Sequence, residues 1–214
     1  FKPEETSENC LYLNIWLQKS QINNKSSPIP VSFYIQYGSF CYGLGDEKEF
    51  DVEVFNKKNV ILITINYRVN VFGFLAHQLL LQQDSTKHSQ SSAILDILKA
   101  LKLIKRYISN FWGYSNKITV IDESKSMFNN VILQIGVAYK NHPFYYHSLE
   151  KYLKIGEEFF EPFKVKSVQD MQSIKVENLF ERNDEIYGVK RISFVPMILI
   201  QKTSSLVGII YYKK

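Results

Sequence analysis

An α/β fold with a mostly parallel, twisted sheet flanked by helices is predicted by two segments of the chain. Residues 60–66 are almost wholly apolar and β-branched, as in a strand that is buried on both faces. Residues 94–111 instead repeat apolar side chains at helical spacing and carry basic side chains late in the segment, where the helix dipole favours them. Strands that alternate with a long helix are typical of a parallel sheet.

The remaining elements follow from the same two periods. Residues 11–17 place an aliphatic side chain at every second position, which predicts a strand. Gly113 is expected to end the long helix. Beyond Glu177 the pattern is less regular. The apolar segment 206–212 is β-prone, but the sequence does not indicate which strand it would pair with. Further strands are expected at 31–35, 118–121 and 131–134, and a second long helix at 149–160.

Composition bounds the class of protein. The chain has 214 residues, of which 45% are hydrophobic and 22% charged, as in one soluble globular domain spanning residues 1–214. The net charge is +5, but the lysines are scattered, which argues against a nucleic-acid partner. No apolar run approaches the roughly 18 residues of a membrane-spanning helix, so no transmembrane segment is expected. The sequence starts at Phe1 without a signal-peptide pattern, which leaves a mature form, a fragment and an incomplete gene model as alternatives.

Five segments stand out as motifs: residues 7–15, 64–75, 118–124, 132–136 and 193–196. Together they resemble the carboxylesterase family that includes cholinesterases and neuroligins. Residues 7–15 are similar to its S-E-D-C-L-Y-L-N signature, and residues 64–75 to its T-I-N-Y-R-L-G-V-F-G-F-L block. Residues 118–124 resemble the strand that leads into F-G-E-S-A-G. Segments 132–136 and 193–196 look like the later I-x-Q-S-G and F-x-P motifs. The resemblance thus runs in family order from residue 7 to residue 196.

This resemblance implies a fold and a reaction. The fold is the α/β-hydrolase fold, of which this chain would hold a part. The reaction is hydrolysis of a small-molecule carboxylic ester by a Ser-Glu-His triad, in which the serine attacks and the histidine takes its proton. No cofactor is expected, and the resemblance implies a secreted or extracellular protein.

Ser124 stands at the position of the family's nucleophile. The elbow that carries such a serine is a strained turn, and glycines two residues on either side give it room. Here these positions hold Asp122 and Ser126, whose side chains crowd the turn. Asp122 also adds negative charge beside a developing oxyanion. The alternative interpretation is an ordinary surface serine after a strand.

The family's oxyanion hole matches the residues around Gly38, where one of three family glycines remains. The resemblance implies backbone N–H donors from Gly38, Ser39 and Lys125, the last being the residue after the serine. The alternative interpretation is a plain turn between a strand and a loop.

Features expected of an active esterase are missing. The segment between Ser124 and the next predicted strand is shorter than the roughly 10–12 residues that a helical crossover needs. The family's triad glutamate and histidine lie farther along, yet the residues after Pro196 contain no histidine, aspartate or glutamate. Four histidines match no triad position, lack metal-ligand spacing and are expected to be solvated loop residues, so no metal site is expected: His77, His88, His142 and His147.

Cysteine usage and one sequon bear on the compartment. Cys10 matches a family disulfide cysteine whose partner lies upstream. It is therefore free, or paired with Cys41, or separated from a lost upstream segment. Asn24 begins an Asn-Lys-Ser glycosylation sequon, which supports secretion.

Three functions stay open at this point. The first is a carboxylesterase relative that is inactive or severely impaired. The second is a fragment of an active secreted carboxylesterase, with Ser124 as nucleophile and triad partners beyond Lys214. The third is a non-catalytic, neuroligin-like extracellular binding module, which the fourteen tyrosines would suit. Neither the substrate nor the oligomeric state is indicated by the sequence.

Overall fold

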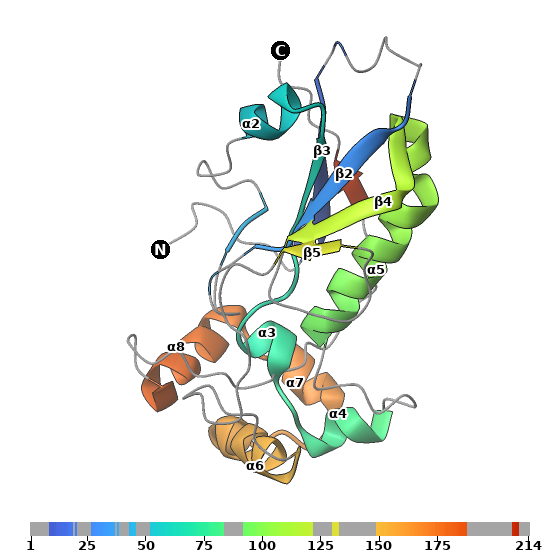
Figure 1. The fold of residues 1–214 in the computed structure, drawn as a ribbon. Coiled ribbons are helices and arrows are strands. Elements are labelled where there is room, and N and C mark those ends of the chain that lie inside the picture. The colour runs from blue at the N-terminus through green and yellow to red at the C-terminus, as the bar shows by residue number, and fades with distance from the viewer. Residues whose placement is uncertain are drawn as a thin grey trace.

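A computed structural model of the chain contains one sheet with helices on its face and at one end (Figure 1). It describes residues 9–18, 20, 27–36, 38, 43–45, 52–83, 92–121, 130–132, 149–187 and 207–209. The strands are β1 (Tyr12–Trp16), β2 (Ile29–Tyr34), β3 (Ile61–Ile65), β4 (Gly113–Ile121), β5 (Asn130–Ile132) and β6 (Val207–Ile209). The helices are α2 (Val52–Lys57), α3 (Val71–Phe74), α4 (Gln78–Gln83), α5 (Ser92–Tyr107), α6 (Leu149–Phe160), α7 (Val168–Ser173) and α8 (Val176–Tyr187).

The described strands form a sheet in the order β5-β4-β2-β3-β1-β6. Four of the five pairings are parallel, and only β1 runs antiparallel to β3. The prediction of a mostly parallel sheet is confirmed. Strand β6 also finds its place, beside β1 and parallel to it, which the sequence pattern alone did not indicate.

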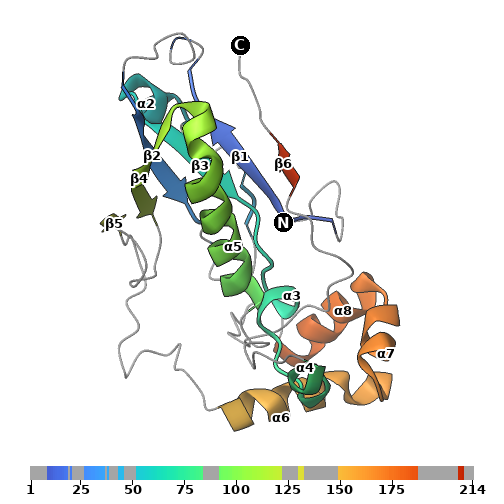
Figure 2. The same ribbon diagram turned by 90° about the vertical axis from the view of Figure 1, so that its right-hand side faces the viewer.

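The main hydrophobic core lies between the sheet and α5, which runs along one face (Figure 2). Every second residue of the strands faces this helix. Phe33 of β2 and Ile63 of β3 belong to this core and are fully buried. Helix α5 contributes Ile97, Ala100 and Ile104 to the same core. Burial of one such aliphatic side chain stabilises the fold by about 1.5–3 kcal/mol. The helix predicted from residues 94–111 is therefore present, but its buried face differs from the predicted one: Ile94 and Leu95 at the start of the pattern are 39% and 42% exposed.

The ends of α5 differ from the prediction. The helix begins at Ser92, two residues before the predicted start, and it ends at Tyr107. A 3₁₀ turn (Ile108–Phe111) follows, and Trp112 takes the left-handed backbone conformation that was expected of Gly113. Gly113 is instead the first residue of β4, which is five residues longer at its start than predicted. A Cβ at Gly113 would meet the Ile108 side chain, so close packing explains this glycine.

A second hydrophobic core joins the helices that gather at the end of the sheet where β2 and β4 finish (Figures 1 and 2). Phe159 and Phe160 of α6 pack there against residues from α3, α4 and α7. Arg182 of α8 donates to the carbonyls of Glu158 and Phe159, which ties α8 to the C-terminal end of α6. Helix α6 has the predicted bounds, whereas the shorter helices around it were not predicted.

His77 lies in this second core, so its prediction as a solvated loop residue is wrong. The side chain is only 7% exposed, and its ring packs edge-on against Phe160. Its Nδ1 accepts the backbone N–H of Leu79 in the first turn of α4. Burial lowers the pKa of His77, and the nearby Glu157 carboxylate opposes this shift in part. The other three histidines lie outside the described residues.

We expect His77 to make the protein less stable as pH falls. Because the folded pKa lies below the unfolded value of about 6.5, the unfolded chain binds the proton first, and the stabilisation present above that pH is lost below it. Urea unfolding at pH 7.5 and 5.5 measures the effect. His77→Asn keeps an acceptor for Leu79 N–H without titrating, and it should show a smaller difference between the two pH values. An equal difference in both proteins would contradict this role.

Gly156 lets α6 lie directly on the Ala76 backbone, because a Cβ there would collide with the Ala76 carbonyl. We expect Gly156→Ala to lower the free energy of unfolding by about 1–3 kcal/mol, as overpacked cores do. Lys154→Ala, on the exposed side of the same helix, is the control and should change stability by less than about 0.5 kcal/mol. Urea denaturation measures both, and an equal effect of the two substitutions would count against the close approach.

Candidate functional site

The neighbouring strands β2 and β4 end side by side at one edge of the sheet. The chain leaves β2 toward β3 on one side, and it leaves β4 toward β5 on the other. Ile35 N–H donates to the carbonyl of Ile121 at 3.2 Å, so the two strand ends are level. In open α/β sheets, ligands bind outside the carboxyl ends of strands at such a switch point. The residues that follow β2 and β4 are therefore the candidate site.

Gly38 is the sequence-predicted site residue that the structure describes. Its φ is 120°, in the region that favours glycine, so a side chain at this position would strain the turn. Ser39, Ser124 and Lys125 lie outside the described residues, and their predicted roles stay predictions. The same holds for Cys41 and Asn24. Strands β4 and β5 are joined by residues 122–129, fewer than the roughly 10–12 residues of a standard helical crossover.

Polar contacts hold the far end of the turn segment, which we define as residues 36–45. The Gln36 side chain donates from Nε2 to the Gly43 carbonyl at 2.9 Å. Asn14 donates to the carbonyl of Gly45 at 3.3 Å, and Asn66 Oδ1 accepts the Gly45 N–H at 2.6 Å. A Cβ on Gly45 would come within 2.9 Å of the Ile65 backbone. The segment therefore returns to lie against the end of β3.

Tyr67 holds the near end of the turn segment. Its hydroxyl donates to the backbone carbonyl of Gln36 at 3.1 Å, and the residue is only 4% exposed. Within the described part of the chain, Gln36 Oε1 is buried without a hydrogen-bond partner. Such an orphaned acceptor costs about 1–3 kcal/mol, and unsatisfied buried groups of this kind call for a functional or structural explanation.

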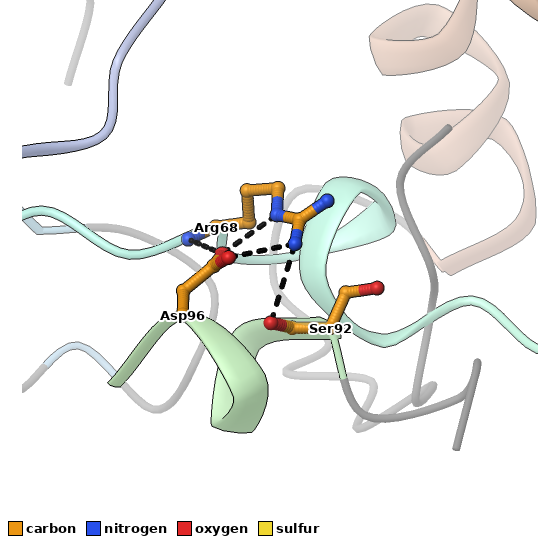
Figure 3. A network of polar contacts seen from close by, with 3 residues as sticks. All are labelled: Arg68, Ser92 and Asp96. Atoms are coloured by element: carbon orange, nitrogen blue, oxygen red, sulfur yellow. Dashed lines mark hydrogen bonds and ion pairs between the residues drawn. The ribbon is translucent and has the colours of Figure 1, made fainter. Parts of the chain in front are cut away.

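An ion pair fixes the residues after β3 to the start of α5 (Figure 3). Arg68 donates from Nε to Asp96 Oδ2 at 2.6 Å and from Nη2 to Oδ1 at 2.7 Å. Its backbone N–H also points to Asp96 Oδ2 at 3.3 Å, and Nη2 reaches the Ser92 carbonyl at 3.4 Å. Both side chains are buried, at 7% and 6% exposure. These contacts give Asp96 a structural role.

We expect Asp96→Asn to be strongly destabilising. The amide leaves the buried Arg68 cation without its countercharge, and breaking one side of a buried pair costs about 3–5 kcal/mol. Glu53→Gln breaks the exposed Glu53–Lys57 pair, whose side chains are 70% exposed, and serves as the matched control. Urea denaturation of both variants tests the prediction. A loss for Asp96→Asn no larger than that of the control would contradict it.

Sequence reasoning missed the residues that hold the turn segment. The block 64–75, quoted for the family resemblance, contains Asn66, Tyr67 and Arg68. The motif thus included these residues but did not indicate what they contact. Gln36 and Gly45 gave no such signal. In the described ranges, no group of three histidine, cysteine, aspartate or glutamate residues could hold a metal ion. No helix there is long and apolar enough to cross a membrane.

Comparison with known proteins identifies the family. The sequence model of the carboxylesterase family matches residues 1–126, more than half of the chain. The chain belongs to the carboxylesterase family. It is 35% identical over 144 residues to fumonisin B1 esterase of Sphingopyxis macrogoltabida, covering 60% of this chain and 26% of that protein. It is 32% identical over 118 residues to venom carboxylesterase-6 of Apis mellifera, covering 55% and 19%.

Solved structures confirm the fold. The chain superposes on a carboxylesterase of Geobacillus stearothermophilus with a TM-score of 0.70 and 26% identity, covering 90% of this chain and 44% of that one. The neighbouring structures are α/β-hydrolase esterases, so the predicted α/β-hydrolase fold is correct. The chain spans about a quarter or less of the length of the curated relatives it matches. Hydrolysis of carboxylic esters is the reaction of the family.

Proposed function

We propose that this carboxylesterase-family chain has a serine ester-hydrolase site at the switch point of its sheet and that the site is severely impaired. The substrate is a small-molecule carboxylic ester. Ser124 is the nucleophile, and the backbone N–H groups of Gly38, Ser39 and Lys125 are the oxyanion donors. The level ends of β2 and β4 carry this proposal, because residues 36–39 and 122–125 leave the sheet from there.

Gly38 supports the oxyanion half of the site. Its φ of 120° is a conformation that favours glycine, and Gly38 lies four residues after Tyr34, the last residue of β2. Backbone N–H groups in such turns can face a developing oxyanion, and the loss of one donor costs about 2.7–4 kcal/mol in known hydrolases. The conformation of Gly38 therefore suits the donor role.

Impairment follows from the residues around the nucleophile. The elbow of this fold needs small residues two positions before and after the serine, where this chain has Asp122 and Ser126. The Asp122 carboxylate also opposes negative charge on the substrate oxygen. His77 does not supply a free base, because its Nδ1 accepts the N–H of Leu79 and its ring packs on Phe160.

The compartment and the domain organisation are part of the same proposal. We take residues 1–214 as a single partial α/β-hydrolase domain of a secreted protein. The Asn24 sequon supports secretion, as does the likeness to a venom carboxylesterase. The family match supports one domain, because the matched residues 1–126 contain four adjacent strands of one sheet, β4, β2, β3 and β1.

Restoring glycine at the elbow should raise esterase activity. We expect the double variant Asp122→Gly/Ser126→Gly to hydrolyse a short-chain p-nitrophenyl ester at least about tenfold faster than the wild type, a gain of about 1.4 kcal/mol in the barrier. Asp122→Asn removes the charge and keeps the side chain, so it separates electrostatic from steric impairment. Adding Ser124→Ala to the double variant should abolish the gain.

Two outcomes would contradict the proposal. If the wild type already shows kcat/KM above about 10⁴ M⁻¹s⁻¹, lost in Ser124→Ala, the site is not impaired, and the chain is part of an active carboxylesterase. If no variant shows hydrolysis that depends on Ser124, the site is no ester-hydrolase site. A non-catalytic binding module then explains the fold better.

A further inference from the structure

The segment that follows β3 touches the turn segment at both of its described ends. The Tyr67 hydroxyl binds the Gln36 carbonyl at the point where the turn segment leaves β2. The adjacent Asn66 accepts the N–H of Gly45, where the turn segment returns to the sheet. Asn66 N–H in turn donates to the Tyr12 carbonyl, which extends the pairing of β3 with β1. Two neighbouring residues of one anchored segment thus hold both ends of another.

This arrangement is rigid because each part is buried or bonded on several sides. The Arg68–Asp96 pair fixes the next residue to α5. Asn14, whose amide binds the Gly45 carbonyl, also donates to Thr64 Oγ1 of β3 at 3.3 Å. The turn segment between these contacts carries glycines at positive φ, Gly38 at 120° and Gly43 at 133°. Glycines of this kind are free to adopt other conformations, so the contacts at the two ends must select this one.

We infer that Asn66 and Tyr67 are positioning residues that hold Gly38, the proposed oxyanion donor that the structure describes, in place through their contacts with Gly45 and Gln36. The inference rests on the proposed function, since it gives the segment its role. Oxyanion donors act only when they are held at about 2.7–3.1 Å from the position of the developing charge, so a loosened turn loses their effect. Neither side chain needs to touch the substrate, because both act through the backbone of residues 36–45.

Three variants and one control test the inference. Tyr67→Phe removes the hydroxyl that binds the Gln36 carbonyl. Asn66→Leu removes the acceptor for Gly45 N–H at similar volume, and Asn66→Asp restores an acceptor oxygen. Tyr152→Phe is the control, because it removes the hydroxyl of another buried tyrosine, which lies in α6 away from the turn segment.

Two measurements on the full chain separate positioning from general stability. Amide hydrogen exchange of Gly45 reports the contact with Asn66, while the amide of Ile63 in the centre of the sheet reports global unfolding. The second measurement is the rate at which a fluorophosphonate ester phosphonylates Ser124, forming an oxygen–phosphorus bond with loss of fluoride. Intact-mass spectrometry follows that reaction, and Ser124→Ala verifies its position.

We expect Gly45 exchange in Asn66→Leu to accelerate at least about tenfold with Ile63 unchanged, and Asn66→Asp to restore protection. Phosphonylation should slow at least about tenfold in Tyr67→Phe and Asn66→Leu, since one lost oxyanion donor costs about 10²–10³ in kcat. It should recover in Asn66→Asp and stay at the wild-type rate in Tyr152→Phe. The inference is overturned if phosphonylation that depends on Ser124 is unchanged in Tyr67→Phe and Asn66→Leu.

Failure of the proposed function looks different. In that case neither the wild type nor its Ser124→Ala variant is phosphonylated. The exchange rate of the Gly45 amide alone then shows whether Asn66 holds the turn segment in place. Unchanged Gly45 exchange in Asn66→Leu then overturns the inference as well. Selective loss of protection, restored by Asn66→Asp, supports the positioning of the turn segment by Asn66.

Discussion

The buried pair of Arg68 and Asp96 is the interaction on which the rest of the structure depends. It joins the end of the central strand β3 to the beginning of α5, the two elements between which the main core forms. A buried ion pair adds little net stability over an apolar pair, because desolvation offsets most of the attraction. Its effect here is geometric, since a bidentate contact of 2.6 and 2.7 Å allows only one relative placement of the two segments.

The position of Arg68 also affects the turn segment at the carboxyl edge of the sheet, through the two residues that precede Arg68. Asn66 and Tyr67 precede Arg68 directly, and each holds one end of the turn segment. A displacement of Arg68 would therefore move the contacts to Gln36 and Gly45 together. Within the turn segment, Gln36 donates to the Gly43 carbonyl, while the described glycines at positions 38 and 43 leave the backbone conformationally free, so the contacts from Asn66 and Tyr67 restrict it further.

Much of the fold was predictable because its periods are local. The buried run 60–66 became β3, fully buried as expected, and α6 has the predicted ends. Helix α8 escaped prediction although it is as long as α6, and contacts from a distant part of the chain help to hold it, as the bonds of Arg182 to the end of α6 illustrate. The burial of His77 is hidden for the same reason, since its cover, Phe160, lies far along the chain. At the site, a motif marked Asn66 and Tyr67, but only the fold shows what they contact.

Folding and catalysis place their demands on different residues of this chain. Among the described residues, the last member of the main core is Val120, and β4 ends at Ile121. Asp122 and Ser126 follow it, so side chains there can replace the elbow glycines without removing a core contact that the structure describes. A chain can thus keep the fold of the family whether or not the residues around its nucleophile position support the reaction. The match of the family model to residues 1–126 therefore concerns the sequence pattern of the family, and the reactivity of Ser124 is a separate property.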